Sequence, residues 1–263
     1  MTQKTALITG ASAGIGARFA AFYAAKGYDL ILTARREDRL TALAGRLSAD
    51  HGITATALAA DMADPTAPDH LWTEITARGL HVDVLINNAG YGMMRRFVDY
   101  PWPEHQDFIQ VMVTSYAHLC RLALPGMIER GYGRIINVAS LAGLIPGSIG
   151  HTLYGASKAF LIKMSESLAL ETEGTGVHVT ALNPGFTRSE FHDVAGIRDT
   201  VDQVPAWMWM TADAVVEEAV AANEKGLAQI IPGRVNRVMA LIARLLPPRV
   251  ALGISRRRSA RYE

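Results

Sequence analysis

The stretch TALITGASAGIGARFA, residues 5–20, contains the pattern that decides the fold: a short apolar run, a glycine-rich turn and a helix. The apolar run ends in Gly10, as a buried parallel strand does, and helical spacing begins at Ile15. Gly10, Gly14 and Gly16 permit a tight turn and let a pyrophosphate approach the backbone at a helix N-terminus. The spacing G-x-x-x-G-x-G alone is weak evidence, because three glycines can simply pack a helix on a strand. Its place in the first of several such units favours nucleotide binding.

The same order of strand and helix repeats along the chain. Apolar runs predict strands at 5–10, 28–34, 54–61, 82–90, 133–140, 176–185 and 227–233. Helical spacing predicts helices at 15–26, 36–49, about 65–78, 104–130 with an interruption near Pro125, 154–172 and 211–225. This alternation predicts an α/β fold with a doubly wound parallel sheet, Rossmann-like, in which ligands bind beyond the carboxyl ends of the strands. With no linker visible, we expect one domain at 1–233 and a basic extension at 234–263.

Length and composition fit a single large domain. The chain has 263 residues, and 49% of them are hydrophobic, which is enough for a sizeable core. We find no apolar run close to the roughly 18 residues of a transmembrane helix, and no signal-peptide cleavage pattern at the N-terminus. The single cysteine, Cys120, cannot form an intramolecular disulfide and is interpreted as a small buried side chain. We therefore expect a cytoplasmic protein without a metal site.

The formal net charge of +1 conceals an asymmetry. Residues 234–263 contain eight arginines and one acid, so the rest of the chain is mildly acidic. Apolar residues between Val235 and Leu246 follow helical spacing, and Pro247 ends the pattern. Such a basic amphipathic segment can pack on another subunit, which we place first, or lie on an anionic membrane surface. Nothing in the acidic body indicates nucleic-acid binding.

Further motifs follow the glycine turn in a fixed order. They are Asp61 after the third strand, NNAG at 87–90, Ser140, Tyr154 with Lys158, and NPGFTRS at 183–189. From about Lys4 to Phe191 the chain thereby resembles the short-chain dehydrogenases/reductases. The resemblance implies an oxidoreductase that interconverts a ketone and a secondary alcohol with a nicotinamide cofactor, and it implies a homodimer or homotetramer. It places the cofactor against Gly10, Ser12, Gly14, Ile15, Gly16, Arg35, Asp61, Met62, Asn88, Ala89, Gly90, Tyr154, Lys158, Pro184, Gly185, Thr187 and Ser189.

The end of the second strand predicts which nicotinamide is used. In this fold an acid there binds the ribose 2′-hydroxyl, and arginine accommodates a 2′-phosphate. Here Ala34 stands at the position of the acid, and Arg35 and Arg36 follow. We predict NADP(H), with Arg35 as the main phosphate partner and Ser12 as a helper. The alternative is that the arginines are solvated and paired with the two acids that follow, which fits Arg36 better.

The resemblance also assigns the chemistry. Tyr154 would be the general acid or base, Lys158 would bind the nicotinamide ribose, and Ser140 would hold the substrate oxygen. Since Lys158 lies one helical turn from Tyr154, its ammonium is expected to lower the pKa of the phenol. One position departs from the family: Met112 stands where an asparagine usually holds a water for proton relay. Either the proton leaves by another path, with Thr114 and Ser115 nearby, or catalysis is slower.

The substrate side is the least readable part. In the family the segment at about 190–210 is a variable lid, and here it ends in Trp207, Met208, Trp209 and Met210. Large rings and thioethers suit an apolar substrate, and Met93, Met94 and Phe97 could line the opposite wall. Core packing is an equally good explanation. We therefore expect an NADPH-dependent carbonyl or 3-oxoacyl reductase, with a non-catalytic, cofactor-sensing interaction protein as the alternative.

Overall fold

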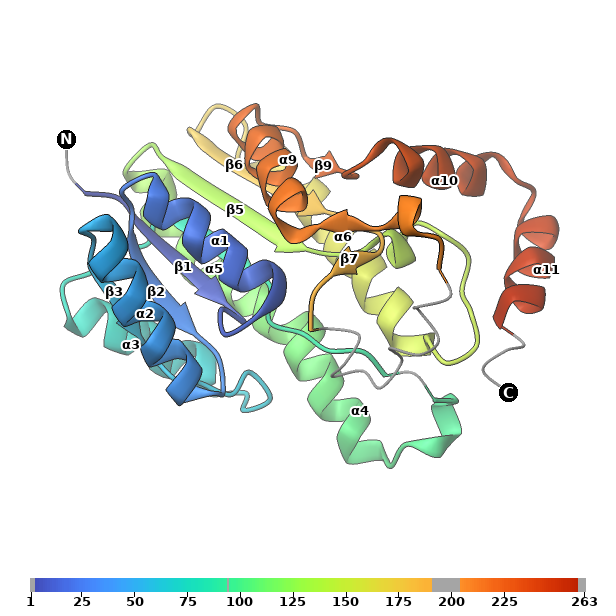
Figure 1. Ribbon diagram of the computed structural model, residues 1–263, viewed down its shortest axis with the longest axis horizontal. Coiled ribbons are helices and arrows are strands. Elements are labelled where there is room, and N and C mark those ends of the chain that lie inside the picture. Colours follow the sequence, from blue (N-terminus) through green and yellow to red (C-terminus); the bar gives the residue numbers. More distant parts are fainter. Residues whose placement is uncertain (1–2, 94, 191–203, 260–263) are drawn as a thin grey trace.

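The computed structural model describes residues 3–93, 95–190 and 204–259, and it contains the predicted parallel sheet (Figure 1). In this part of the chain seven strands pair in the order β3-β2-β1-β4-β5-β6-β9. They are β1 Thr5–Thr9, β2 Asp29–Thr33, β3 Ala55–Ala57, β4 Val84–Asn87, β5 Gly133–Val138, β6 Val177–Leu182 and β9 Gln229–Ile230. The strand order reverses between β1 and β4, so a ligand crevice is expected beyond their carboxyl ends. The Rossmann-like α/β fold is confirmed.

The sheet is buried on both faces, which explains why its strands are continuous apolar runs. Residues in register across five strands form one row of a core cluster: Leu7, Ile31, Leu85, Ile135 and Val179. The neighbouring row on the opposite face includes Ile8, Leu32, Ile86 and Ile136. Each such side chain contributes about 1.5–3 kcal/mol on burial, so the sheet is a rigid base for the site.

Helices cover each face. Residues of α1 Gly14–Ala25, α2 Glu37–His51 and α9 Ala212–Glu224 join the core on one face. The other face is covered by α3 Ala67–Ala77, α5 Ser115–Glu129 and α6 Thr152–Glu171. The first and last strands of the sheet in space, β3 and β9, are both short, which limits the exposed edges.

The long helical stretch breaks at a different place from the one predicted. It comprises α4 Trp102–Ile109, a π-helical turn at Gln110–Thr114 and α5, and Pro125 lies inside α5. The prediction of an interruption near Pro125 is therefore wrong. Burial of Ala123 and Met127 on either side of the proline holds that part of the helix against the sheet despite the missing N–H.

Within the described residues, one helical run, Trp102–Glu129, is long and apolar enough to cross a membrane, in contrast to the expectation that no run approaches this length. In its most apolar window 44% of the residues are buried inside the protein, and Leu119, Cys120 and Met127 belong to the core below the sheet. This is the pattern of a core helix in a globular fold.

Shorter elements surround the carboxyl end of the sheet. A second, small sheet pairs β7 Thr187–Arg188 with β8 Met210–Thr211. The 3₁₀ turns are η1 Phe97–Asp99, η3 Leu141–Gly143 and η4 Ala206–Met208. The C-terminal extension forms α10 Arg234–Leu245 and α11 Pro248–Ser259, which Figure 1 shows at the side of the molecule away from β3.

Candidate active site

The glycine-rich turn has the geometry that a bound pyrophosphate requires. Gly10 and Gly14 have φ values of 63° and 56°, in the left-handed region that favours glycine. At Gly16 a Cβ atom would lie 2.4 Å from the carbonyl oxygen of Gly10 and 2.5 Å from Nδ2 of Asn88. The turn therefore accepts no side chain at Gly16, and it is pressed directly against the end of β4.

Hydrogen bonds fix the turn to the strand that follows. The Asn88 side chain donates from Nδ2 to the carbonyl oxygens of Thr9 (2.9 Å) and Gly10 (3.2 Å). In return, Oγ1 of Thr9 accepts from the backbone N–H groups of Asn88 and Ala89, each at 2.9 Å. The NNAG segment thus supports the turn. Asn87 lies below it, fully buried, and donates to Oδ1 of Asn137 at 2.9 Å.

The N-terminus of α1 fits the anionic part of a dinucleotide. The residue that precedes the helix is Ala13, which offers no side-chain cap, and the first turn contains no acid. The first N–H groups of a helix otherwise lack acceptors and carry partial positive charge, so they suit a phosphate. Gly14 also lies close to Ser189, because an added Cβ would be 3.1 Å from the Ser189 Cβ.

The arginines after β2 differ from the prediction in their contacts. Arg36 donates to Oγ of Ser12 from Nη2 at 3.0 Å and from Nε at 3.3 Å. It also pairs with Glu190 at 3.4 Å, and Arg39 pairs with the same carboxylate at 2.9 Å. Arg35 lines the same pocket but is exposed. The guanidinium that shares Ser12 is therefore Arg36 rather than Arg35, and Arg36 does not pair with the two acids that follow it.

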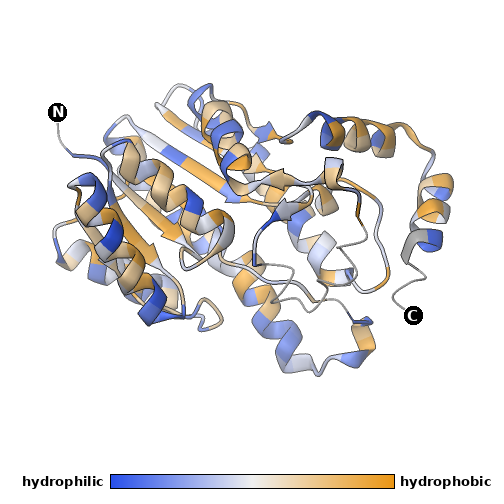
Figure 2. Cartoon of the chain, in the orientation of Figure 1, coloured by the Kyte–Doolittle hydropathy of each residue, from blue (hydrophilic) through white to orange (hydrophobic). Residues whose placement is uncertain are grey.

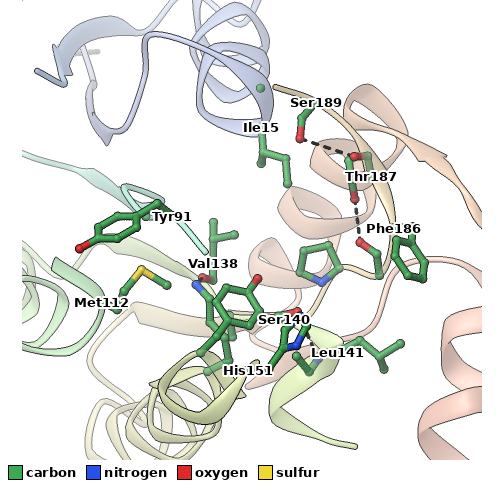
Figure 3. Close-up of a pocket in the computed structure, with 18 of the residues that line it drawn as sticks. Ile15, Tyr91, Met112, Val138, Ser140, Leu141, His151, Phe186, Thr187 and Ser189 are labelled. Carbon is green, nitrogen blue, oxygen red and sulfur yellow. Dashed lines mark hydrogen bonds between the residues drawn. The ribbon is translucent and has the colours of Figure 1, made fainter. Parts of the chain in front are cut away.

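Within the described residues, a large pocket of about 1600 Å³ connects this region with Ser140, Tyr154 and Lys158 (Figure 3). Every predicted site residue lines it except Gly16, which lies behind the turn. Figure 3 shows Tyr91 and Met112 on one side of the pocket and Phe186 and Thr187 on the other. Asp61 lies on the rim and accepts from the backbone N–H of Ala63, while the neighbouring Met62 is buried at 4% exposure.

Ser140 and Tyr154 meet at the carboxyl end of β5. Ser140 directly precedes η3 and caps it, since its Oγ accepts a hydrogen bond from the N–H of Ala142 at 3.1 Å. Tyr154 lies in the first turn of α6, and its side chain hydrogen-bonds with Ser140. Burial raises the pKa of Tyr154 above its ordinary value of 10, and the bond with Ser140 acts in the opposite direction. The expected lowering of the tyrosine pKa by Lys158 is therefore not what the structure shows.

Lys158 is buried beneath the phenol. Its Nζ donates to the carbonyl oxygen of Val138 at 2.8 Å and lies 5.6 Å from the centre of the Tyr154 ring. The same Nζ lies 5.7 Å from the centre of the Tyr116 ring. Burial lowers the pKa of Lys158 to about 7, because few polar groups replace the water that a charged ammonium loses. Burial thus disfavours the charged form of both Tyr154 and Lys158.

Met112 occupies the middle of the π-helical turn and is fully buried. Its sulfur fills the space in front of Gly90, where an added Cβ would lie only 2.7 Å from Sδ. Ser115, one turn later, is buried and donates to the carbonyl oxygen of Val111 at 2.8 Å, while Thr114 is exposed. Neither residue is among those that line the pocket, so neither stands in for the usual asparagine.

The loop after β6 closes the pocket on the side of Pro184. Thr187 donates from Oγ1 to the carbonyl oxygen of Gly185 at 3.1 Å, and both residues line the pocket (Figure 3). Gly185 packs directly on Asn236, since an added Cβ would lie 2.3 Å from Oδ1 of that residue. Asn236 is itself buried and donates to the carbonyl oxygen of Pro232 at 2.8 Å. The start of α10 thus supports the loop from behind.

The substrate side of the pocket contains only some of the residues predicted for it. Met93 is buried in the core and Phe97 stacks on His105 outside the pocket, so the predicted opposite wall is wrong for both. Met94 and residues 191–203 lie outside the described residues. Of the lid, Trp207 and Met208 line the pocket, whereas Met210 packs against the core.

Sequence reasoning missed several pocket residues. They include Tyr91, Leu141, Ile145, His151, Val235, Met239, Ile242 and Leu246. The last four belong to α10 and the residue after it, whose helical spacing was visible but was assigned to contacts outside the site. His151 lies against the Tyr154 ring, with the two ring centres 6.2 Å apart. Its position three residues before Tyr154, directly before α6, was the available signal.

Comparison with known proteins agrees with this geometry. The family model of short chain dehydrogenases matches residues 4–198. The chain belongs to this family. It is therefore an oxidoreductase of the alcohol and ketone couple that uses a nicotinamide dinucleotide, and in the structure the glycine turn and the motif residues Ser140, Tyr154 and Lys158 line the same pocket.

Several individual proteins resemble the chain. A very-long-chain 3-oxoacyl-CoA reductase of Phaeosphaeria nodorum is 40% identical over 178 residues, covering 66% of this chain and 52% of the relative. A short-chain dehydrogenase of Sphingobium yanoikuyae, solved with NADPH, has a TM-score of 0.81 and 34% identity, covering 91% of this chain and 92% of the other. The bulky-bulky ketone specific alcohol dehydrogenase of Comamonas testosteroni has a TM-score of 0.77 and 27% identity, covering 94% and 96%. The aligned part spans from about half to three quarters of the length of the first curated relatives.

Proposed function

We propose that this short-chain dehydrogenase is an NADPH-dependent reductase of bulky, apolar ketones, including the 3-oxoacyl type. The observation that carries the proposal is the apolar wall that continues from Ser140 and Tyr154 away from the glycine turn. It is formed by Leu141, Ile145, Trp207, Met208, Val235, Met239, Ile242 and Leu246. A ketone held by Ser140 would extend along this wall, where apolar surface is removed from water.

The choice of NADPH rests on the charges at the adenosine end. Arg36 and Arg35 both reach the pocket, no acid occupies the position of Ala34, and Ser12 adds a hydroxyl beside Arg36. Guanidinium groups bind phosphate oxygens with charge-assisted hydrogen bonds. The NADPH-bound structure from Sphingobium yanoikuyae, similar over most of the chain, supports the same choice. Because of its bond with Ser12, we assign the main 2′-phosphate contact to Arg36 and a secondary one to Arg35.

The protonation of the site favours reduction. A bound nicotinamide supplies the hydride that the ketone carbon accepts. Since burial raises the pKa of Tyr154, its phenol is protonated at neutral pH and can donate its proton to the carbonyl oxygen. Ser140 hydrogen-bonds with the Tyr154 side chain and can also bind the carbonyl oxygen of the ketone. It thereby holds this carbonyl oxygen next to the hydroxyl group of Tyr154. The Nζ of Lys158 lies 5.6 Å from the centre of the Tyr154 ring. When this amine is protonated, it stabilises the phenolate that remains after proton transfer.

The relatives and the pocket wall support the substrate class. One relative is named a very-long-chain 3-oxoacyl-CoA reductase and one solved neighbour a bulky-bulky ketone specific alcohol dehydrogenase. Arg234 and Arg257 line the same pocket and could bind an anionic group at one end of the substrate. The closeness of Ser140, Tyr154 and Lys158 supports a catalytic protein over the non-catalytic alternative.

Substitution of the phenol tests the proposal. In Tyr154→Phe we expect NADPH-dependent ketone reduction to fall by roughly 10²–10⁴-fold, because the proton donor is lost. NADPH binding, followed by fluorescence titration, should change little. The matched control is Tyr91→Phe, which removes a phenol from the opposite wall of the pocket and should retain turnover. Retention of most activity in Tyr154→Phe, or equal losses in both variants, would refute the mechanism.

A panel of ketones tests the substrate class. Turnover, as kcat/KM with NADPH, should rise with the apolar size of the ketone and fall for small, strongly hydrated ketones. Comparison of chains with and without a terminal carboxylate shows whether Arg234 and Arg257 contribute. A uniform response across the panel would contradict the assignment to bulky apolar substrates.

A further inference from the structure

The outer surface of the C-terminal helices is apolar although it faces water. In α10 the side chains of Val238, Leu241 and Leu245 are 55%, 56% and 73% exposed. They recur at three- and four-residue spacing and therefore form one stripe along the helix. In α11 the exposed apolar side chains are Val250, Leu252 and Ile254. Figure 2 shows hydrophobic residues along both helices, at the side of the molecule. Contiguous exposed apolar surface of this kind marks an interaction site.

The stripe is continuous with the wall of the substrate pocket. Val235, Met239 and Leu246 turn the adjoining face of α10 into the pocket, and Ala251 and Ile254 of α11 join them. Ile242 belongs to both surfaces, since it lines the pocket and is 52% exposed. A partner that covered the stripe would therefore lie beside an opening of the pocket.

The charges around the stripe are of one sign. From Arg234 to Ser259 the sequence contains no acidic residue. The arginines whose side chains the structure describes are all exposed, namely Arg234, Arg237, Arg244, Arg249, Arg256 and Arg257. Among the ion pairs of the described residues, only Arg237 of this set takes part, with Glu218. An apolar stripe bordered by arginine is the pattern of a helix that lies in the surface of an anionic bilayer.

A second copy of the chain fits this surface less well. The common two-fold interface uses the same patch on both copies, which would bring the arginines of one copy against those of the other. Like charges placed together in this way oppose association. An anionic lipid surface instead complements all of them. The cytoplasmic leaflet carries such a charge, which is compatible with the predicted cytoplasmic location.

We propose that α10 and α11 dock this protein on an anionic bilayer surface, with the apolar stripe among the acyl chains and the arginines at the lipid headgroups. An apolar ketone dissolved in the bilayer then reaches the pocket along α10 without crossing water. This second statement rests on the proposed function, whereas the docking does not.

Sedimentation with lipid vesicles tests the docking. The full chain is mixed with vesicles of phosphatidylcholine with or without phosphatidylserine, and the bound fraction is measured. We expect binding to the anionic vesicles that weakens as salt rises. Leu241→Glu with Leu245→Glu should lower the partition at least tenfold, because two apolar side chains become charged. Arg249→Glu with Arg256→Glu should lower it about 25-fold or more, at about fivefold for each lost charge contact.

Matched controls separate docking from general effects of charge. Leu170→Glu changes a leucine of α6 that is 69% exposed, close to the 73% of Leu245, and should leave the partition unchanged. Arg46→Glu with Arg121→Glu reverses two exposed arginines outside the extension and should have a much smaller effect than the pair in α11. None of the substituted residues lines the pocket. Near-native thermal melting of each variant verifies its fold.

Kinetics separate the two statements. With a water-soluble ketone, the docking variants should retain the turnover of the unmodified chain. With a long-chain ketone carried in anionic vesicles, the unmodified chain should reduce the ketone faster than the docking variants do. If ketones are reduced but the unmodified chain stays in the supernatant, the docking proposal is wrong and the proposed function stands. If the chain binds vesicles but reduces no ketone, the proposed function fails and the docking stands.

Two further outcomes would overturn the docking proposal. One is equal binding to neutral and anionic vesicles that the stripe variants do not change. The other is a dimer, detected by size-exclusion chromatography with light scattering, that Leu245→Glu converts to a monomer while vesicle binding is absent. That second result would assign the stripe to contact between copies of the chain.

Discussion

Replacement of Lys158 by methionine should change how the stability of the protein depends on pH. Lys158 ordinarily titrates at 10.5, and burial lowers its pKa to about 7 in the folded protein. Between these values the unfolded chain holds one proton more at this side chain than the folded chain does. The free energy of unfolding therefore rises with pH in this window, by about 1.4 kcal/mol for each pH unit. Below the folded pKa both states carry the charge, and the contribution is constant.

The magnitude follows from the same two values. From about pH 6 to about pH 9, the unmodified protein should gain roughly 3 kcal/mol of unfolding free energy relative to Lys158→Met. Methionine has a similar length and does not titrate, so the variant lacks this gain. Loss of the hydrogen bond to Val138 shifts the stability of the variant by a constant amount, which cancels in the comparison across pH.

Urea unfolding at several pH values measures the effect on the cofactor-free protein. The unfolding free energies of the two proteins are subtracted at each pH, so that titrations common to both cancel. Lys163→Met is the matched control, because Lys163 lies on the same helix with its side chain 80% exposed. A difference between Lys158→Met and the unmodified chain that stays constant with pH would refute the reasoning, because Lys158 would then titrate alike in both states.

Three further predictions concern the cofactor side and the proton path. Gly16→Ala should weaken NADPH binding and lower the free energy of unfolding by about 1–3 kcal/mol, because the new Cβ meets the Gly10 carbonyl and the Asn88 amide. Calorimetric titration of NADPH and thermal melting measure the two effects. The control is Gly45→Ala in α2, where a Cβ meets open space, and it should be neutral or stabilising. Glu190→Gln should lower the KM for NADPH by up to about fivefold without a matching change for NADH, because Arg36 and Arg39 lose an exposed competitor for the 2′-phosphate; equal changes with both cofactors would contradict this. If the buried sulfur of Met112 blocks proton relay, Met112→Asn should increase kcat in stopped-flow and steady-state measurements. If these rates do not rise, the proton leaves by another path.

Local pattern was sufficient for the parts of the site that neighbouring residues build. The glycine turn follows from residues 10–16, and the pairing of Tyr154 with Lys158 follows from one turn of helix. The strands that bring Ser140 to Tyr154 were visible as apolar runs. In each case the decisive contacts lie within a short stretch, or at strand ends that a parallel sheet necessarily aligns.

The remainder depends on contacts between distant parts of the chain. Arg36, not Arg35, binds Ser12, and Glu190, more than 150 residues later, also holds it. The helix 102–129 breaks at a π turn around Met112 rather than at Pro125, because core packing decides where the helix can deviate. The C-terminal helix lines the pocket, although its apolar spacing is equally compatible with other partners. Oligomeric state and cellular location stay predictions.

The contact between Gly185 and Asn236 limits how the end of the chain can be altered. Asn236 stands in the first turn of α10, and it supports from behind the loop that closes the pocket. Shortening the protein before this residue would remove a support of the loop after β6 together with the surface helices, so a truncated chain could not report on surface contacts alone. Fusions and tags placed after α11 preserve that support. Substrate preference can therefore be redesigned along the later turns of α10 while Asn236 is kept as a fixed point.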